Sequence, residues 1–72
     1  MSMIRLTERY YDVHAHGYCS KPLFLRSECI AGVKSSEDRY ENYTIVSTTY
    51  GATYMVRESA ETVVAMCAQE ET

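Results

Sequence analysis

The segment YTIVSTT at residues 43–49 favours an extended strand, because every residue in it is β-branched, aromatic or serine. It is followed by Tyr50-Gly51-Ala52, which has the composition of a tight turn. The next segment, TYMV at 53–56, can then run back along the first. These residues predict a β-hairpin, around which the rest of the chain has to build a sheet.

Three shorter apolar segments predict further strands. They are MIRLT at 3–7, PLFLR at 22–26 and IAGVKS at 30–35. Because successive side chains of a strand point to opposite faces, Ile4 and Leu6 are expected to share one face of the first segment.

The same alternation assigns faces in the other two segments. Leu23 and Leu25 are expected to share one face of the second. In the third, Ala31 and Val33 are expected on one side and Ile30 on the other.

The C-terminal segment RESAETVVAMCAQ predicts a helix over about residues 60–68. Ser59 is a favourable N-cap, and Glu61 lies in the first turn, where the helix dipole favours negative charge. Apolar residues recur at spacings of three and four and predict one buried stripe, formed by Ala60, Val63, Val64 and Cys67. The acidic end at 69–72 is expected to fray.

These elements predict a small α+β fold, an antiparallel sheet of four or five short strands with one C-terminal helix, in a single domain over 1–72. Residues 27–29 are expected to form a turn, and 35–42 a solvent-exposed loop. Residues 8–21 are expected to be an insertion, either an extra hairpin or an extended arm.

The three cysteines, Cys19, Cys29 and Cys67, are an odd number and cannot form a complete set of internal disulfides. Free thiols favour a reducing compartment, so we expect the protein to be cytoplasmic. No apolar run has the length of a signal peptide core or a membrane span, so no membrane association is expected.

Charge argues against nucleic acid as a partner. The chain carries 7 Lys and Arg against 10 Asp and Glu, a net charge of −3. Nucleic-acid binding depends on clustered basic residues. Here they are scattered, and most have an acidic residue within four positions, among them Arg5, Arg9, Lys34, Arg39 and Arg57.

The order and composition of these segments resemble the FlbD-like small flagellar and swarming-motility proteins. The resemblance covers about residues 3–7 and 22–67, and it departs at the fourteen-residue segment 8–21. It implies the same small fold and a role as a motility accessory protein, while similar short chains in phages imply a phage-encoded alternative. The matching residues are Ile4, Leu6, Thr7, Leu25, Ile30, Val33, Thr44, Val46, Gly51, Tyr54, Val56, Glu58, Ser59 and Val63.

The pattern Asp-x-His-x-His at 12–16 raises the possibility of a metal site. On a strand, Asp12, His14 and His16 would share one face. A small zinc module could use His14, His16 and Cys19, with Cys29 or Asp12 as the fourth ligand. A second pair of ligands of the usual spacing is missing, so we expect neither a metal nor another cofactor.

Catalysis is not expected either. Cys19 follows His16 closely, but the sequence has no glycine-rich elbow or second acid to support a nucleophile.

Tyrosine is frequent instead, with seven residues against one Phe and no Trp. Tyrosine is enriched at protein interfaces. We therefore predict a small non-enzymatic regulator or inhibitor that binds another protein, for example a phage protein that occludes a host enzyme or defence complex. The predicted contact residues are Tyr10, Tyr11, His14, His16, Tyr18, Glu37, Asp38 and Tyr40.

A second interpretation is a ligand-sequestering oligomer for a small anionic, nucleotide-like molecule. Its candidate residues are Arg5, Arg26, Arg57 and Tyr54, because guanidinium groups bind phosphate through two hydrogen bonds. Self-association as a homodimer or higher oligomer is expected in either case, with 43–49 and 3–7 as free strand edges.

Overall fold

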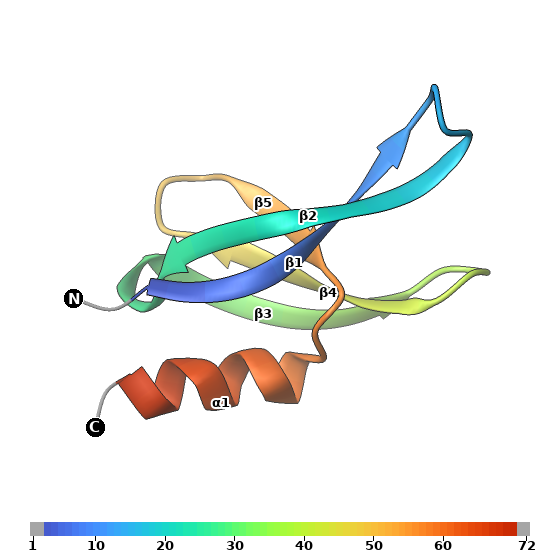
Figure 1. The fold of residues 1–72 in the computed structure, drawn as a ribbon. Coiled ribbons are helices and arrows are strands. Elements are labelled where there is room, and N and C mark those ends of the chain that lie inside the picture. The colour runs from blue at the N-terminus through green and yellow to red at the C-terminus, as the bar shows by residue number, and fades with distance from the viewer. Residues whose placement is uncertain (1–2, 71–72) are drawn as a thin grey trace.

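The computed structural model describes residues 3–70 and confirms the α+β prediction (Figure 1). The remaining positions, which include part of the acidic end, lie outside the described residues. The elements are β1 (Met3–Asp12), β2 (Gly17–Arg26), the short 3-10 helix η1 (Ser27–Cys29), β3 (Ile30–Glu37), β4 (Asn42–Thr48), β5 (Thr53–Val56) and α1 (Ala60–Glu70).

The five strands form one antiparallel sheet in the order β2-β1-β5-β4-β3. The edges are therefore β2 and β3, and the prediction that 43–49 and 3–7 provide free edges is wrong. β4 lies between β3 and β5, and β1 lies between β2 and β5. Any strand-to-strand association of two copies would use β2 or β3.

The junction between β1 and β5 brings residues far apart in the sequence together. Only Glu8 and Val56 are paired in register. Next to that pair, the Thr7 amide donates to both carboxylate oxygens of Glu58 at 2.8 and 3.1 Å, and the Arg57 amide donates to the Thr7 carbonyl at 2.9 Å. The first strand is thereby fastened to the segment that leads into α1.

The sheet is strongly curled, because η1 joins its two edge strands within three residues. The four steps from Arg26 to Ile30 can span at most about 14 Å, whereas four gaps between strands of a flat sheet would need about 19 Å. At this end the edges must approach each other, and the Thr49 amide donates to the Cys29 carbonyl at 2.9 Å.

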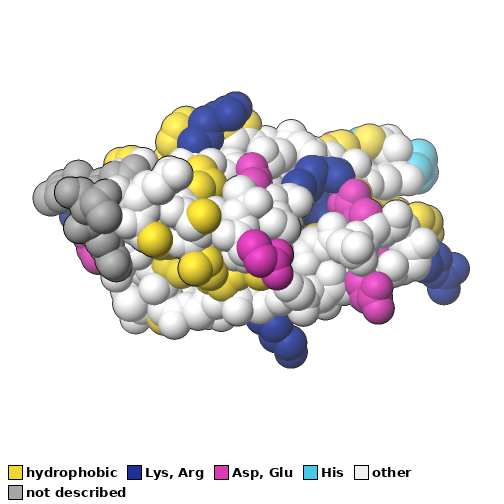
Figure 2. Space-filling model, turned by 90° about the horizontal axis from the view of Figure 1, so that it is seen from below, with side chains coloured by type: hydrophobic (Ala, Val, Ile, Leu, Met, Phe, Trp, Pro, Cys, Tyr) yellow, Lys and Arg dark blue, Asp and Glu magenta, His cyan; other side chains and the backbone are white. Residues whose placement is uncertain are grey.

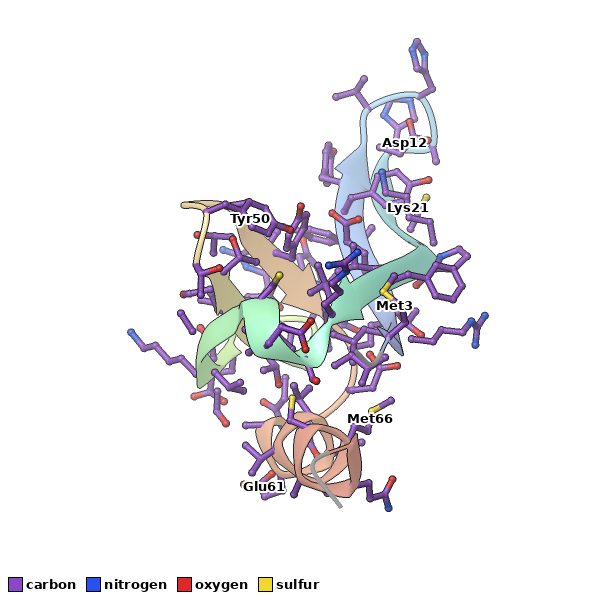
Figure 3. The ribbon with its side chains drawn as sticks, turned by 90° about the vertical axis from the view of Figure 1, so that its left-hand side faces the viewer. Met3, Asp12, Lys21, Tyr50, Glu61 and Met66 are labelled. Carbon is purple, nitrogen blue, oxygen red and sulfur yellow. The ribbon has the colours of Figure 1, made fainter. Side chains whose placement is uncertain are left out.

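The hydrophobic core lies between one face of the sheet and α1. Its buried side chains are Ile4, Leu6, Leu25, Val46, Val56 and Val63. The alternation predicted for 3–7 and 22–26 is confirmed, since Phe24, next to Leu25, is exposed on the opposite face. Figure 3 shows Met66 on the side of α1 near the sheet and Glu61 away from it.

The start of α1 agrees with the sequence. Ser59 Oγ accepts a hydrogen bond from the Thr62 amide at 3.1 Å, and the Ser59 carbonyl accepts from the Val63 amide at 3.0 Å. This is the geometry of an N-cap. No helix in the part of the chain that the structure describes is both long and apolar enough to cross a membrane.

Two predictions about packing are wrong. Val64 is 56% exposed, because the buried stripe of α1 is narrow and follows Val63, Met66 and Cys67 at spacings of three and four.

In β3, an irregularity between Ile30 and Gly32 shifts the alternation of side chains. Ile30 and Val33 therefore both pack against the core, while Ala31 is exposed.

Residues 8–21 are neither a separate hairpin nor an arm. They continue β1 and β2 into one long hairpin, paired from Met3 with Arg26 to Asp12 with Gly17. The loop between β3 and β4 is shorter than predicted, 38–41 instead of 35–42. We call β1–β2 the first hairpin and β3–β4 the second; both project at the same end of a molecule that measures 41 × 19 × 19 Å (Figure 1).

Candidate functional site

The Asp-x-His-x-His segment forms the turn at the tip of the first hairpin (Figure 3). Asp12 Oδ1 accepts hydrogen bonds from the amides of His14 at 2.9 Å and Ala15 at 3.4 Å. His16 has a positive φ of 54°. The prediction that these three side chains share a strand face is wrong, because β1 ends at Asp12. The carboxylate holds the turn, and both histidines are exposed.

A zinc site is not assembled from these residues. Cys19 lies within β2, half-buried and opposite Tyr10. Among residues 3–70, no group of three His, Cys, Asp or Glu side chains is arranged to hold a metal ion.

The most unusual residue at this end is Arg9, which is 2% exposed. It lies five positions after Ile4, so alternation places it on the sheet face opposite the hydrophobic core. Its guanidinium lies over two aromatic rings, with Cζ 3.6 Å from the ring centre of Tyr18 and 4.6 Å from that of Tyr43. A cation over such rings is attracted by their negative faces.

Two carboxylates from the second hairpin complete the surroundings of Arg9. Nη2 donates a hydrogen bond to Asp38 Oδ2, and Nε lies 2.5 Å from Glu41 Oε1 as an ion pair without hydrogen-bond alignment. Burial alone would lower the pKa of Arg9, but the hydrogen bond to Asp38 and the charges of Asp38 and Glu41 raise it. The guanidinium therefore stays charged.

Asp38 also organises its own loop. Its Oδ1 accepts from the amides of Tyr40 at 2.8 Å and Glu41 at 3.0 Å, and its amide donates to the Glu41 carbonyl at 3.1 Å. Hydrogen bonds from the Glu41 and Tyr40 amides, followed by the contact with Arg9, lower the pKa of Asp38. The carboxylate form thus fixes both the loop and the arginine.

A second arginine shares Glu41. Arg57 Nη1 donates to Glu41 Oε1 at 2.9 Å and Oε2 at 2.6 Å, and Arg57 Nε donates to Ser20 Oγ. The two arginines and two carboxylates, Arg9, Arg57, Asp38 and Glu41, form one network that we call the arginine cluster. Its formal charges sum to zero, and it joins both hairpins to the end of β5.

Three exposed tyrosine rings lie beside the arginine cluster. The ring centres of Tyr11 and Tyr18 are 5.4 Å apart with planes at 78°, and those of Tyr18 and Tyr40 are 6.3 Å apart at 56°. The three residues are 55%, 38% and 74% exposed. We call Tyr11, Tyr18 and Tyr40 the tyrosine platform; it spans the gap between the two hairpins.

The tyrosine platform borders a surface cavity of about 360 Å³. Figure 2 shows basic and acidic side chains next to one another between the two projecting hairpins, with histidine at the tip of one. The cavity is lined by Arg9, Tyr11, His16, Gly17, Tyr18, Tyr40, Glu41 and Arg57.

The structure therefore brings together part of the predicted contact set. Tyr11, His16, Tyr18, Asp38 and Tyr40 lie at the arginine cluster or the cavity.

The other predicted contact residues lie apart from the cavity. The Tyr10 ring lies 4.8 Å from Lys21 Nζ, and His14 is exposed in the turn. Glu37 borders a different hollow, beside the start of α1.

Arg9, Tyr43 and Glu41 were missed as site residues. Arg9 could have been found from its odd spacing to Ile4 and Leu6, which places a charge among tyrosines on the second face of the sheet. Its carboxylate partners could not, because they come from a distant loop.

The residues of the ligand-sequestering alternative do not converge within one chain. Arg26 pairs opposite Met3, whereas Arg57 contacts Ser20, six residues earlier in β2, a distance of about 20 Å along the strand. The Tyr54 hydroxyl lies 3.5 Å from that of Tyr50.

The resemblance to FlbD-like proteins stays a prediction. Comparisons with protein-family models, with curated proteins and with solved structures found no match.

Proposed function

We propose that the protein is a non-enzymatic regulator that binds another protein through the tyrosine platform. The observation that carries this proposal is the contact of exposed tyrosine rings from two hairpins above a buried arginine. Large exposed side chains are usually scattered singly over a surface. Tyrosine offers a large contact area with few rotatable bonds and a polar tip, which suits an interface anchor.

The arginine cluster supports binding by holding the platform in one arrangement. Tyr18 packs directly on Arg9, and the Tyr40 amide is bonded to Asp38. A surface that is already ordered loses less conformational entropy when a partner binds.

The same contacts argue against acid–base catalysis at this site. A general base needs a free lone pair and a pKa near the working pH. Glu41 is bound by two arginines, and Asp38 is bound by Arg9 and two amides, with its pKa lowered.

A protein of this kind acts by covering a surface of its partner. The resemblance to FlbD-like proteins and to short phage chains implies two settings, a phage-encoded inhibitor of a host enzyme or defence complex and a motility accessory protein. In both, the three thiols fit a cytoplasmic location.

The proposal is tested by capturing partners from cells that express the chain and then measuring binding of the purified partner by calorimetry. We expect the Tyr11→Ser, Tyr40→Ser double variant to bind about 30-fold more weakly, the loss of one or two anchors worth about 2 kcal/mol. The matched control is Tyr50→Ser, an equally exposed tyrosine at the opposite end, which should bind as the wild type does. A partner that binds the double variant with wild-type affinity would contradict the proposal.

A further inference from the structure

We infer that the tyrosine platform binds a neutral, proline-rich segment in the polyproline II conformation. The inference rests on the proposed function and specifies the kind of partner. It follows from the charge of the cavity, the inclination of its aromatic rings and the free hydroxyl groups around it.

Charge selects a neutral ligand. Both arginines at the cavity, Arg9 and Arg57, already pair with Asp38 or Glu41. An anionic ligand such as a phosphate would meet the carboxylate of Glu41 and would compete with it for both guanidinium groups. A cationic ligand would have to displace an arginine from its carboxylates, and either exchange loses contacts that are partly desolvated. A neutral segment leaves all of them in place.

The inclination of the rings selects a ridged ligand rather than a flat one. Adjacent rings meet at 78° and 56°, so Tyr11, Tyr18 and Tyr40 present an uneven surface of ring edges and faces and no single flat face. A planar base or cofactor ring needs a parallel face on which to stack. Polyproline II advances about 3.1 Å per residue, so alternate residues lie about 6 Å apart. This spacing is close to the 5.4 and 6.3 Å between neighbouring ring centres.

Hydrogen bonding favours the same ligand. The hydroxyl groups of Tyr11, Tyr18 and Tyr40 bond to no other residue of the described chain. Each can therefore donate to a ligand. A polyproline II segment makes no internal hydrogen bonds and presents its carbonyl groups as acceptors. Aromatic-lined grooves are a common way of recognising such segments, because they are extended before they bind.

The test uses a displayed library of random twelve-residue peptides, selected on the wild-type chain and counter-selected on the Tyr40→Ser variant. Tyr40 is the most exposed residue of the platform, so its replacement leaves the fold intact. We expect enrichment of peptides with two or more prolines at spacings of two or three and no net charge. One enriched peptide is then titrated into the labelled protein and followed by two-dimensional NMR.

In that titration, amide signals of 9–18 and 38–43 should shift, while those of α1 should not. Affinity should fall at least tenfold in Tyr11→Ser and in Tyr40→Ser, and should stay within twofold in the control Tyr50→Ser. A control peptide in which alanine replaces each proline should not bind.

Selection of proline-poor peptides that still require Tyr11 and Tyr40 would overturn the inference and leave the proposed function standing. Failure to enrich any peptide that depends on Tyr40 would also overturn it. If, in addition, a captured partner binds the double tyrosine variant normally, the proposed function fails as well.

Discussion

Replacing Arg9 by Met tests whether the arginine cluster stabilises the fold. Methionine keeps most of the volume and can still contact the rings of Tyr18 and Tyr43, but it removes the charge. Asp38 and Glu41 then remain beside each other, and only Glu41 keeps a cation, through Arg57. The substitution should therefore destabilise the protein.

The magnitude follows from burial. Removing one partner of a buried ion pair costs about 3–5 kcal/mol. The side chains of Asp38 and Glu41 are 27% and 30% exposed and can regain part of their hydration, so the loss belongs at the lower end. Contacts of the methionine sulfur with the rings return a fraction of it. We expect Arg9→Met to lower the free energy of unfolding by about 2–3 kcal/mol, a large part of the ~4–10 kcal/mol expected for a domain of this size.

The measurement is thermal and urea unfolding followed by circular dichroism. A loss of this size should lower the melting temperature by roughly 10–20 °C in so small a domain. Lys21→Met is the matched control, because Lys21 also lies near a carboxylate, Glu8 at 3.9 Å, and an aromatic ring, Tyr10 at 4.8 Å, but is mostly exposed. Lys21→Met should lower the free energy of unfolding by less than about 1 kcal/mol. A melting temperature of Arg9→Met equal to or above that of the wild type would refute the reasoning. The desolvation cost of burying the guanidinium would then equal or exceed the free energy gained from its ion pairs and ring contacts.

Three further predictions concern single residues. The folded state lowers the pKa of Asp38 below its usual 3.8, so the ionised side chain stabilises the fold above that pH. This contribution is lost as the pH falls through the pKa of the folded state. Melting temperatures measured from about pH 5 to pH 2 should therefore fall less steeply in Asp38→Asn than in the wild type. Leu6→Ala, at a fully buried core position, should lower the free energy of unfolding by about 2–5 kcal/mol in urea titrations, and a smaller loss than Ser59→Ala would contradict the assigned core. Ser59→Ala should cost about 1 kcal/mol in the same assay by removing the N-cap of α1, whereas Ser59→Asn, which can also cap, should stay near the wild type.

Local patterns in the sequence were sufficient for most elements. Alternation placed Ile4 and Leu6 on a shared face, which is buried in the core, and the β-branched segment and glycine turn identified β4 and β5. Gly51 has a φ of 88°, a conformation that glycine adopts without strain. Such features depend on neighbouring residues, which is why they can be read directly.

The features that were missed depend on pairing between distant segments. The sequence of 8–21 is too polar to resemble a core strand, yet the last five of the ten consecutive pairs between β1 and β2 lie within it. Arg9 was considered beside Glu8, its neighbour in sequence, but its carboxylates are supplied by Asp38 and Glu41, about thirty residues later. The exposure of Val64 depends on how α1 lies across the sheet, which the helical periodicity alone does not determine.

The junction between β1 and β5 has a consequence for the order in which the protein folds. The two hairpins are local in sequence, and isolated hairpins form within about 1–10 μs. The contact of Thr7 with Glu58 joins residues 51 positions apart, so it becomes favourable only after the intervening chain has been ordered. We expect this junction to form late in folding and to break early in unfolding. Weakening the junction would then shorten the lifetime of the native state while leaving the folding rate almost unchanged.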